Sequence, residues 1–191
     1  MLTWHAEDGH GLEGARISFA HGFRAQGRMV RPDFTASYRL TVDENGLLSR
    51  LSVDSDTVER ERSLTMNRTG DGFWLLDSGS GDGGRRTDLG GAVDVDLAHS
   101  PLFNTLPIRR LGLHREPGEQ TLPMAFVTLP ELEVQAVRQT YRTVSVLDGE
   151  AAVVAFSWDD FAAELVVDGD GLVISYPGVA ARLTSDQAAA G

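Results

Sequence analysis

The chain has 191 residues, of which 41% are hydrophobic. That is long and apolar enough to bury a substantial core as a single domain, residues 1–191, and it excludes a disordered protein. A net charge of −11 argues against nucleic acid and anionic bilayer surfaces as partners, since both require a basic face. The absence of cysteine excludes disulfides, thiolate metal sites and a cysteine nucleophile.

The first residues, MLTWHAEDGHGLEG, contain neither the basic region nor the apolar region of a secretory signal. No apolar run approaches the length of a membrane span. We therefore expect a cytoplasmic protein without a transmembrane segment. The oligomeric state does not follow from the sequence.

Short alternating segments separated by turn residues indicate a mainly β protein with at most short helices. ASYRLTV and LLSRLSV flank Asn45-Gly46, a pair typical of a hairpin turn. SLTMNRT and FWLLD flank residues 70–72, and AELVV and LVISYP flank residues 168–171, in the same manner. Residues 158–165 fit a helical spacing behind Ser157 as well as a strand, and the repeat described next favours the strand.

An internal duplication is predicted by two stretches with the same order of features. Tyr38-Arg39 and Tyr141-Arg142 are each followed by a glycine eight positions after the tyrosine, and then by alternating segments and a Gly-Asp-Gly turn. The duplication predicts two β-meanders, residues 30–77 and 133–180, connected through residues 78–132. Their concave faces would form one antiparallel curved sheet or barrel.

Several sharper motifs have simpler explanations. GSGDGG, residues 79–84, matches a nucleotide-binding glycine pattern, but no helical stripe follows it, so we expect a loop. Asp168-Gly169-Asp170-Gly171 lacks the further ligands of a calcium loop and is typical of a hairpin turn. The five histidines have no paired metal-ligand spacing, and no G-x-S-x-G nucleophile motif is present. No metal, cofactor or catalytic triad is therefore predicted.

The densest stretch is DVDLAHSPLFNTLPIRRLGL, residues 94–113. Asp94 and Asp96 share one strand face, where they could serve acid–base chemistry or form ion pairs with Arg109 and Arg110. Ser100-Pro101 is typical of a helix start and Pro107 limits its continuation, which indicates a turn or short helix between them. If residues 108–113 are extended, Arg109 points inward from an apolar wall and needs a carboxylate or a ligand headgroup beside it.

This stretch resembles the signature of the glycolipid-binding family, a bacterial domain of unknown function. Further matches lie along essentially the whole chain: Trp4, Gly11-x-Glu13, the hairpin from Tyr38 to Gly46, Phe73-Trp74, LPELEVQAVRQTY and LVVDGDGLVISYPG. The resemblance implies an antiparallel β fold built by duplication and curved around an apolar cavity. That fold is similar to the unclosed barrels of bacterial lipoprotein and lipid carriers.

The first functional hypothesis is a non-enzymatic lipid- or glycolipid-binding protein with an apolar cavity and a polar rim. The candidate ligand-binding residues, some of them contacting a sugar or anionic headgroup, are Asp94, Asp96, Asn104, Arg109, Arg110, Trp74 and Tyr141. The second hypothesis is an enzyme that uses Asp94 and Asp96 as acid–base carboxylates on a hydrophobic or sugar substrate. The third is an interaction scaffold whose interior is packed solid.

Overall fold

A computed structural model describes residues 1–79, 81, 84–147 and 150–183. Within these residues the chain forms fifteen strands, one α-helix and a short 3₁₀ turn, Leu89–Gly91. The elements are β1 Leu2–Ala6, β2 Leu12–Ser18, β3 Phe23–Val30, β4 Thr35–Val42, β5 Leu48–Asp56, β6 Glu61–Arg68, β7 Trp74–Asp77, β8 Arg85–Thr87, β9 Asp94–Leu97, α1 Pro101–Arg110, β10 Glu119–Val127, β11 Val134–Leu147, β12 Ala151–Trp158, β13 Phe161–Asp168, β14 Val173–Tyr176 and β15 Ala180–Arg182.

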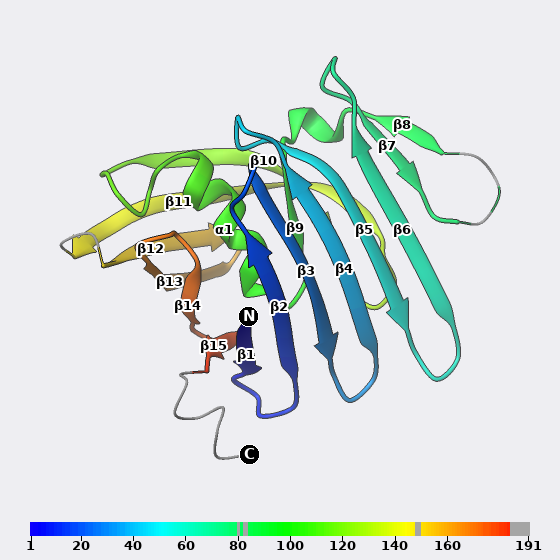
Figure 1. The fold of residues 1–191 in the computed structure, drawn as a ribbon, viewed down its shortest axis with the longest axis horizontal. Helices are drawn as coiled ribbons and strands as arrows, with labels where there is room; N and C mark the ends of the chain where they lie inside the picture. The colour runs from blue at the N-terminus through cyan, green and yellow to red at the C-terminus, as the bar shows by residue number, and fades with distance from the viewer. Residues whose placement is uncertain (80, 82–83, 148–149, 184–191) are drawn as a thin grey trace.

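The strands form one open, curved sheet (Figure 1). Strands β1 to β8 and β10 to β15 each run as a meander, and β1 pairs with β15 to join the two meanders. The free edges are β8 and β9, and β9 pairs in parallel with β10. The predicted mainly β, curved fold is therefore confirmed. Of the two forms expected, the structure adopts the open sheet and not the closed barrel.

The hairpins lie where the turn residues predicted them. Gly46 turns with a φ of 78° between β4 and β5, and Gly171 turns with a φ of 76° between β13 and β14. The Asp43 side chain accepts hydrogen bonds from the backbone amides of Asn45 and Leu47, which fixes the first of these turns. Residues 161–168 form β13, so the helical alternative for this segment is wrong. Gly149 and half of the GSGDGG segment, residues 80, 82 and 83, lie outside the described residues.

The joining segment, residues 94–113, forms β9 and helix α1 inside the curve of the sheet (Figure 1). Ser100 is the N-cap and Pro101 the first helical residue, as predicted. The segment therefore forms the short helix considered for it. Pro107 lies within this helix, so the expectation that Pro107 limits its continuation is wrong. Residues 108–110 are helical, so the extended alternative for residues 108–113 does not occur. All helical residues from Pro101 to Ile108 are buried, and this packing outweighs the proline penalty of about 3 kcal/mol.

Two hydrophobic clusters pack against opposite sides of the joining segment. The larger cluster covers the inner face of the first meander and includes Trp4, Trp74, Leu97 and Phe103. The smaller cluster gathers side chains of the second meander, among them Tyr141 and Phe156, with Ile108 of α1. Among the described residues, no helix has the length and hydrophobicity that a bilayer crossing requires.

The two meanders have matching successions of strands. Strands β4 to β7 occupy the predicted first repeat and β11 to β14 the second, with Tyr38 on β4 and Tyr141 on β11. Both tyrosines are buried and both point toward the joining segment, where Tyr38 contacts Phe103 and Tyr141 hydrogen-bonds to Asn104. Their origin by duplication stays a prediction.

Candidate ligand-binding pocket

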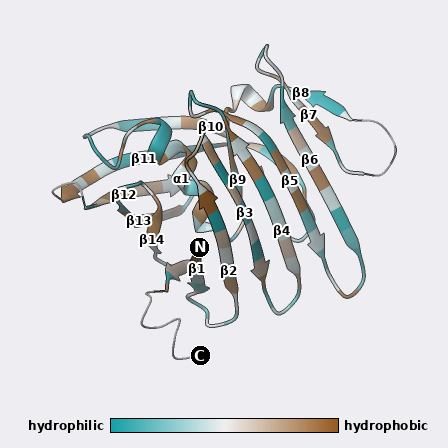
Figure 2. Ribbon diagram, in the orientation of Figure 1, coloured by the Kyte–Doolittle hydropathy of each residue, from teal (hydrophilic) through white to brown (hydrophobic). Residues whose placement is uncertain are grey.

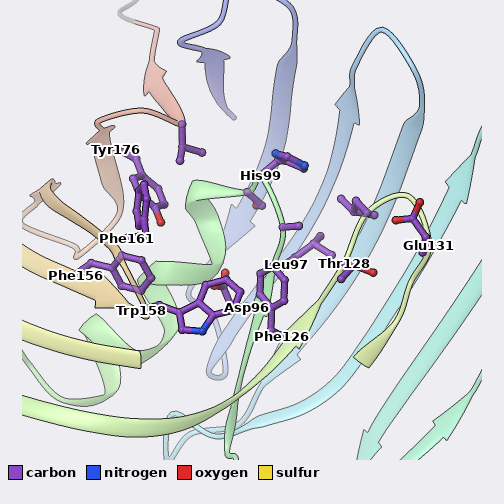
Figure 3. Close-up of a pocket in the computed structure, with 14 residues that line it drawn as sticks. Asp96, Leu97, His99, Phe126, Thr128, Glu131, Phe156, Trp158, Phe161 and Tyr176 are labelled. Atoms are coloured by element: carbon purple, nitrogen blue, oxygen red, sulfur yellow. The ribbon is translucent and has the colours of Figure 1, made fainter. Parts of the chain in front are cut away.

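A pocket of about 530 Å³ lies between the end of β9 and the second meander (Figure 3). Its volume falls within the range of small-molecule sites, roughly 300–1,000 Å³. Strands β9, β10, β12, β13 and β14 contribute to it, together with the turns that follow β9 and β10. The lining residues are Asp96, Leu97, Ala98, His99, Ser100, Phe126, Thr128, Leu129, Glu131, Phe156, Trp158, Phe161, Tyr176 and Val179.

Aromatic side chains make up one wall of the pocket. The ring centroids of Phe126 and Trp158 are 4.5 Å apart, and those of Phe156 and Tyr176 are 5.9 Å apart. Phe161, which is 40% exposed, completes the group and is 6.1 Å from both Phe156 and Tyr176. Phe156 and Trp158 line the same wall because they are two residues apart on β12. Such rings offer a large apolar contact area to a ligand.

Asp96 places a carboxyl group inside this largely apolar pocket. Its side chain accepts a hydrogen bond of 2.6 Å from the Gln139 amide, and the Tyr141 hydroxyl donates to Gln139 at 2.9 Å. Asn104 of α1 donates in turn to Tyr141 at 3.0 Å, so a buried chain of polar groups supports Asp96 from behind. Burial raises the pKa of Asp96 to about 7, and the Gln139 hydrogen bond opposes the rise.

Asp94 has a different environment, although it lies on the same strand face. It forms an ion pair with Arg110 at 2.5 Å, and its carboxylate is fully buried. Burial raises the pKa of Asp94, and the hydrogen bond and charge of Arg110 counteract this effect. The pair fixes the end of α1 to the start of β9. Asp94 does not line the pocket. Of the two predicted carboxylates, Asp94 therefore forms a structural ion pair and Asp96 lines the pocket.

The remaining predicted site residues lie away from the pocket. Arg109 donates to the backbone carbonyl of Asp170 and stacks over the ring of Phe19 at 4.3 Å, on the other side of α1. It does not point inward from an extended strand, because residues 108–110 are helical. Trp74 is fully buried in the first meander and donates to the carbonyl of Ala92 at 2.8 Å. Asn104 and Tyr141 belong to the support chain behind Asp96.

Polar residues line the pocket opposite the aromatic wall. In Figure 3, Tyr176, Phe161, Phe156 and Trp158 lie on one side of Asp96, and His99, Thr128 and Glu131 lie on the other. His99 adopts a left-handed backbone with a φ of 67°, and burial together with the charge of Arg31 lowers its pKa. Two carboxyl groups and no arginine line the described pocket. This arrangement suits an uncharged polar group better than an anion.

The aromatic wall was missed from the sequence. The alternation of Phe156 and Trp158 gives them one strand face, but neither pattern nor composition shows that Phe126 of β10 and Tyr176 of β14 meet that face. Within the described part of the chain, no group of three or more His, Asp or Glu side chains is placed to hold a metal ion.

Comparison with known proteins agrees with this architecture. The family model described as "Putative glycolipid-binding" matches residues 1–182. A crystal structure of a DUF1089 family protein from Pseudomonas aeruginosa superposes with a TM-score of 0.72 and 29% sequence identity, covering 90% of this chain and 92% of that chain. No curated protein matches the chain.

Proposed function

The chain belongs to the glycolipid-binding family, and from this premise we propose that its aromatic pocket binds a lipid or glycolipid with an uncharged, hydroxyl-bearing headgroup. The protein then acts by binding and not by catalysis. The observation that carries the proposal is the buried carboxyl of Asp96, supported from behind by Gln139 and set beside a wall of aromatic rings. Ligand sites combine an apolar lining with a few placed polar groups in this way.

The headgroup assignment rests on the charges around the pocket. The two arginines predicted to contact an anionic headgroup are engaged elsewhere, Arg110 with Asp94 and Arg109 with Asp170. Asp96 and Glu131, in contrast, both line the pocket. A carboxylate or phosphate placed there would meet the exposed Glu131 carboxylate and, above about pH 7, the ionised and buried Asp96. A sugar hydroxyl can instead donate to or accept from Asp96.

A dye-displacement titration tests both parts of this proposal. The uncharged dye N-phenyl-1-naphthylamine should bind saturably, and an alkyl glycoside should displace it at lower concentration than a fatty acid of equal chain length. Replacing Trp158 by Ala should weaken dye binding by roughly tenfold to a hundredfold, the effect of losing one buried aromatic contact. Leu75→Ala, an exposed apolar change on β7 outside the pocket, is the matched control.

The outcomes separate the pocket from its headgroup preference. Absence of saturable dye binding, or equal loss in Trp158→Ala and Leu75→Ala, would contradict the pocket assignment and favour a solid interaction scaffold. Equal displacement by the glycoside and the fatty acid would contradict only the headgroup assignment. Asp96→Asn should bring the displacing concentrations of the glycoside and the fatty acid closer together, because the amide no longer repels the fatty-acid carboxylate.

A further inference from the structure

The outer face of the first meander carries an array of arginines that the pocket does not use. A groove of about 690 Å³ runs across β2 to β5 on this face, and Arg16, Arg28, Arg39 and Arg50 all line it. All four are exposed, and the one carboxylate that lines the groove with them is Asp54. This concentration of positive charge contrasts with the net charge of −11 for the whole chain.

These arginines have no ion-pair partner within the described residues. The four ion pairs found there involve other arginines, at positions 31, 86, 110 and 182. Among the groove arginines, Arg50 donates to the neutral amide of Asn67 at 3.1 Å. Their positive charges are therefore not neutralised locally and are directed to solvent.

The strand register spreads the charges in two dimensions. Arg16 is opposite Gln26, which is opposite Arg39, so these two arginines are roughly 10 Å apart across the sheet. Arg28 lies two residues along β3 from Gln26, roughly 7 Å away in the other direction. Exposed and buried residues alternate along these strands, and Figure 2 shows the hydrophilic bands that result in the first meander. The array fits a planar charged surface better than a single linear polyanion.

Two exposed aliphatic residues lie in the neighbouring row of the same face, which continues through Thr35 to Asp56. Leu12 and Val30 are cross-strand partners, and they are 46% and 48% exposed. Exposed aliphatic side chains beside basic residues are typical of surfaces that contact a lipid bilayer. No aromatic side chain points into the described groove, since Tyr38, whose backbone borders it, is buried on the opposite face. Single-stranded nucleic acid is usually bound with such stacking residues.

We infer that the outer face of β2 to β5 docks on an anionic lipid bilayer, with the four arginines against the headgroups and Leu12 and Val30 at the interface. The overall negative charge of the chain orients the molecule, because only this face is attracted to the bilayer. The inference does not depend on the contents of the aromatic pocket, which lies at the second meander.

Vesicle co-sedimentation tests the inference. The protein should sediment with phosphatidylcholine vesicles that contain phosphatidylserine, should remain in solution with phosphatidylcholine alone, and should be released by high salt. Each arginine replaced by glutamine should weaken binding about fivefold, which corresponds to about 1 kcal/mol per basic residue at an anionic surface. The combined variant is R16Q/R28Q/R39Q/R50Q.

The matched control is R60Q/R115Q/R138Q/R142Q, which changes the net charge equally at exposed arginines outside the groove. Loss of sedimentation in the first variant alone, with unchanged thermal unfolding and unchanged dye binding in the pocket, supports the inference. Equal loss in both variants, equal binding to both kinds of vesicle, or binding to a single-stranded oligonucleotide in place of vesicles would overturn it.

Discussion

Each meander has a buried tyrosine beside a buried carboxyl group, but only one of the two carboxyl groups, that of Asp96, lines the large pocket. In the first meander, Glu13 accepts hydrogen bonds from Tyr38 and, at 2.7 Å, from Ser100 at the start of α1. Beside the second meander, Asp96 of β9 is supported through Gln139 by Tyr141, which also contacts α1. Burial raises the pKa of both carboxyl groups to about 7.

The difference lies in what covers each cluster. The space beside Glu13 measures about 10 Å³, room for about one water molecule, whereas the space beside Asp96 measures about 530 Å³. Tyr38 lies over Gly27, which leaves room for its ring, while Tyr141 contacts Phe156 with ring centroids 5.1 Å apart. Similar groups of hydrogen-bonded polar side chains thus lie in two settings. The group around Glu13 belongs to a packed core, and the group around Asp96 borders a pocket.

The largest expected effect distinguishes Trp74 of the core from Trp158 of the pocket. Trp74→Ala should lower the free energy of unfolding by about 3–5 kcal/mol, because it empties a fully buried site and removes the hydrogen bond to Ala92. Dye binding by the folded fraction should be unchanged. Trp158→Ala should have the opposite profile, a small loss of stability and a large loss of dye affinity. Urea unfolding and dye titration measure both, and a reversed profile would refute the division between core and pocket.

The pH dependence of stability should reveal both buried carboxyl groups. Their pKa values are about 7 in the folded state, above the ordinary values of 3.8 for Asp and 4.5 for Glu. Between about pH 4 and pH 7 the folded protein keeps protons that the unfolded chain has released, so the free energy of unfolding falls as pH rises. The fall amounts to about 1.4 kcal/mol per pKa unit of difference for each group.

Asp96→Asn and Glu13→Gln should each reduce the fall in the free energy of unfolding with rising pH, by about 1–3 kcal/mol at about pH 8. Asp54→Asn, at an exposed carboxylate on β5, is the control and should leave the fall intact. Urea unfolding across the pH range measures the change. Only Asp96→Asn should also alter the competition between glycoside and fatty acid, and the same alteration in Glu13→Gln would show that the cluster at Glu13 communicates with the pocket.

A further effect of comparable size concerns the packing of Tyr38. A Cβ atom at Gly27 would overlap the Tyr38 ring, so Gly27→Ala should lower the free energy of unfolding by about 1–3 kcal/mol. Gly14→Ala, on the neighbouring strand, is the matched control because a Cβ there meets nothing within 4 Å. Equal stability of the two variants in thermal unfolding would show that Tyr38 moves without cost.

The strands and hairpins were predictable because their information is local. Alternation and turn residues such as Asn45-Gly46 specify a hairpin within a dozen residues, and the structure has it there. The expectation that Pro107 limits the helix was wrong because burial against both meanders overrides the local preference of proline. The ion pair of Asp94 with Arg110 was among the interpretations considered, since both residues lie on one short connection.

The pocket was not predictable because it depends on pairing between distant strands. Asp96 was identified, but its partner Gln139 is 43 residues away and reaches it through the register of β9, β10 and β11.

The arginine array was hidden by the net charge, since a sum over the chain contains no information about faces. Only the alternation of β2 to β5, combined with their register, brings Arg16, Arg28, Arg39 and Arg50 together.

The two free edges of the sheet bear on the risk that strands of two chains pair with each other. An open edge offers unpaired backbone groups to a second chain, which is a common origin of strand addition and aggregation. Here β8 is only three residues long and carries Arg85 and Arg86, the latter paired with Asp71 at 2.6 Å. At the opposite edge all four residues of β9 are buried, and α1 contacts this strand. Strand β8 is thus short and charged, and β9 is covered by α1. Both features disfavour the addition of a strand from a second chain at the edges of this open sheet.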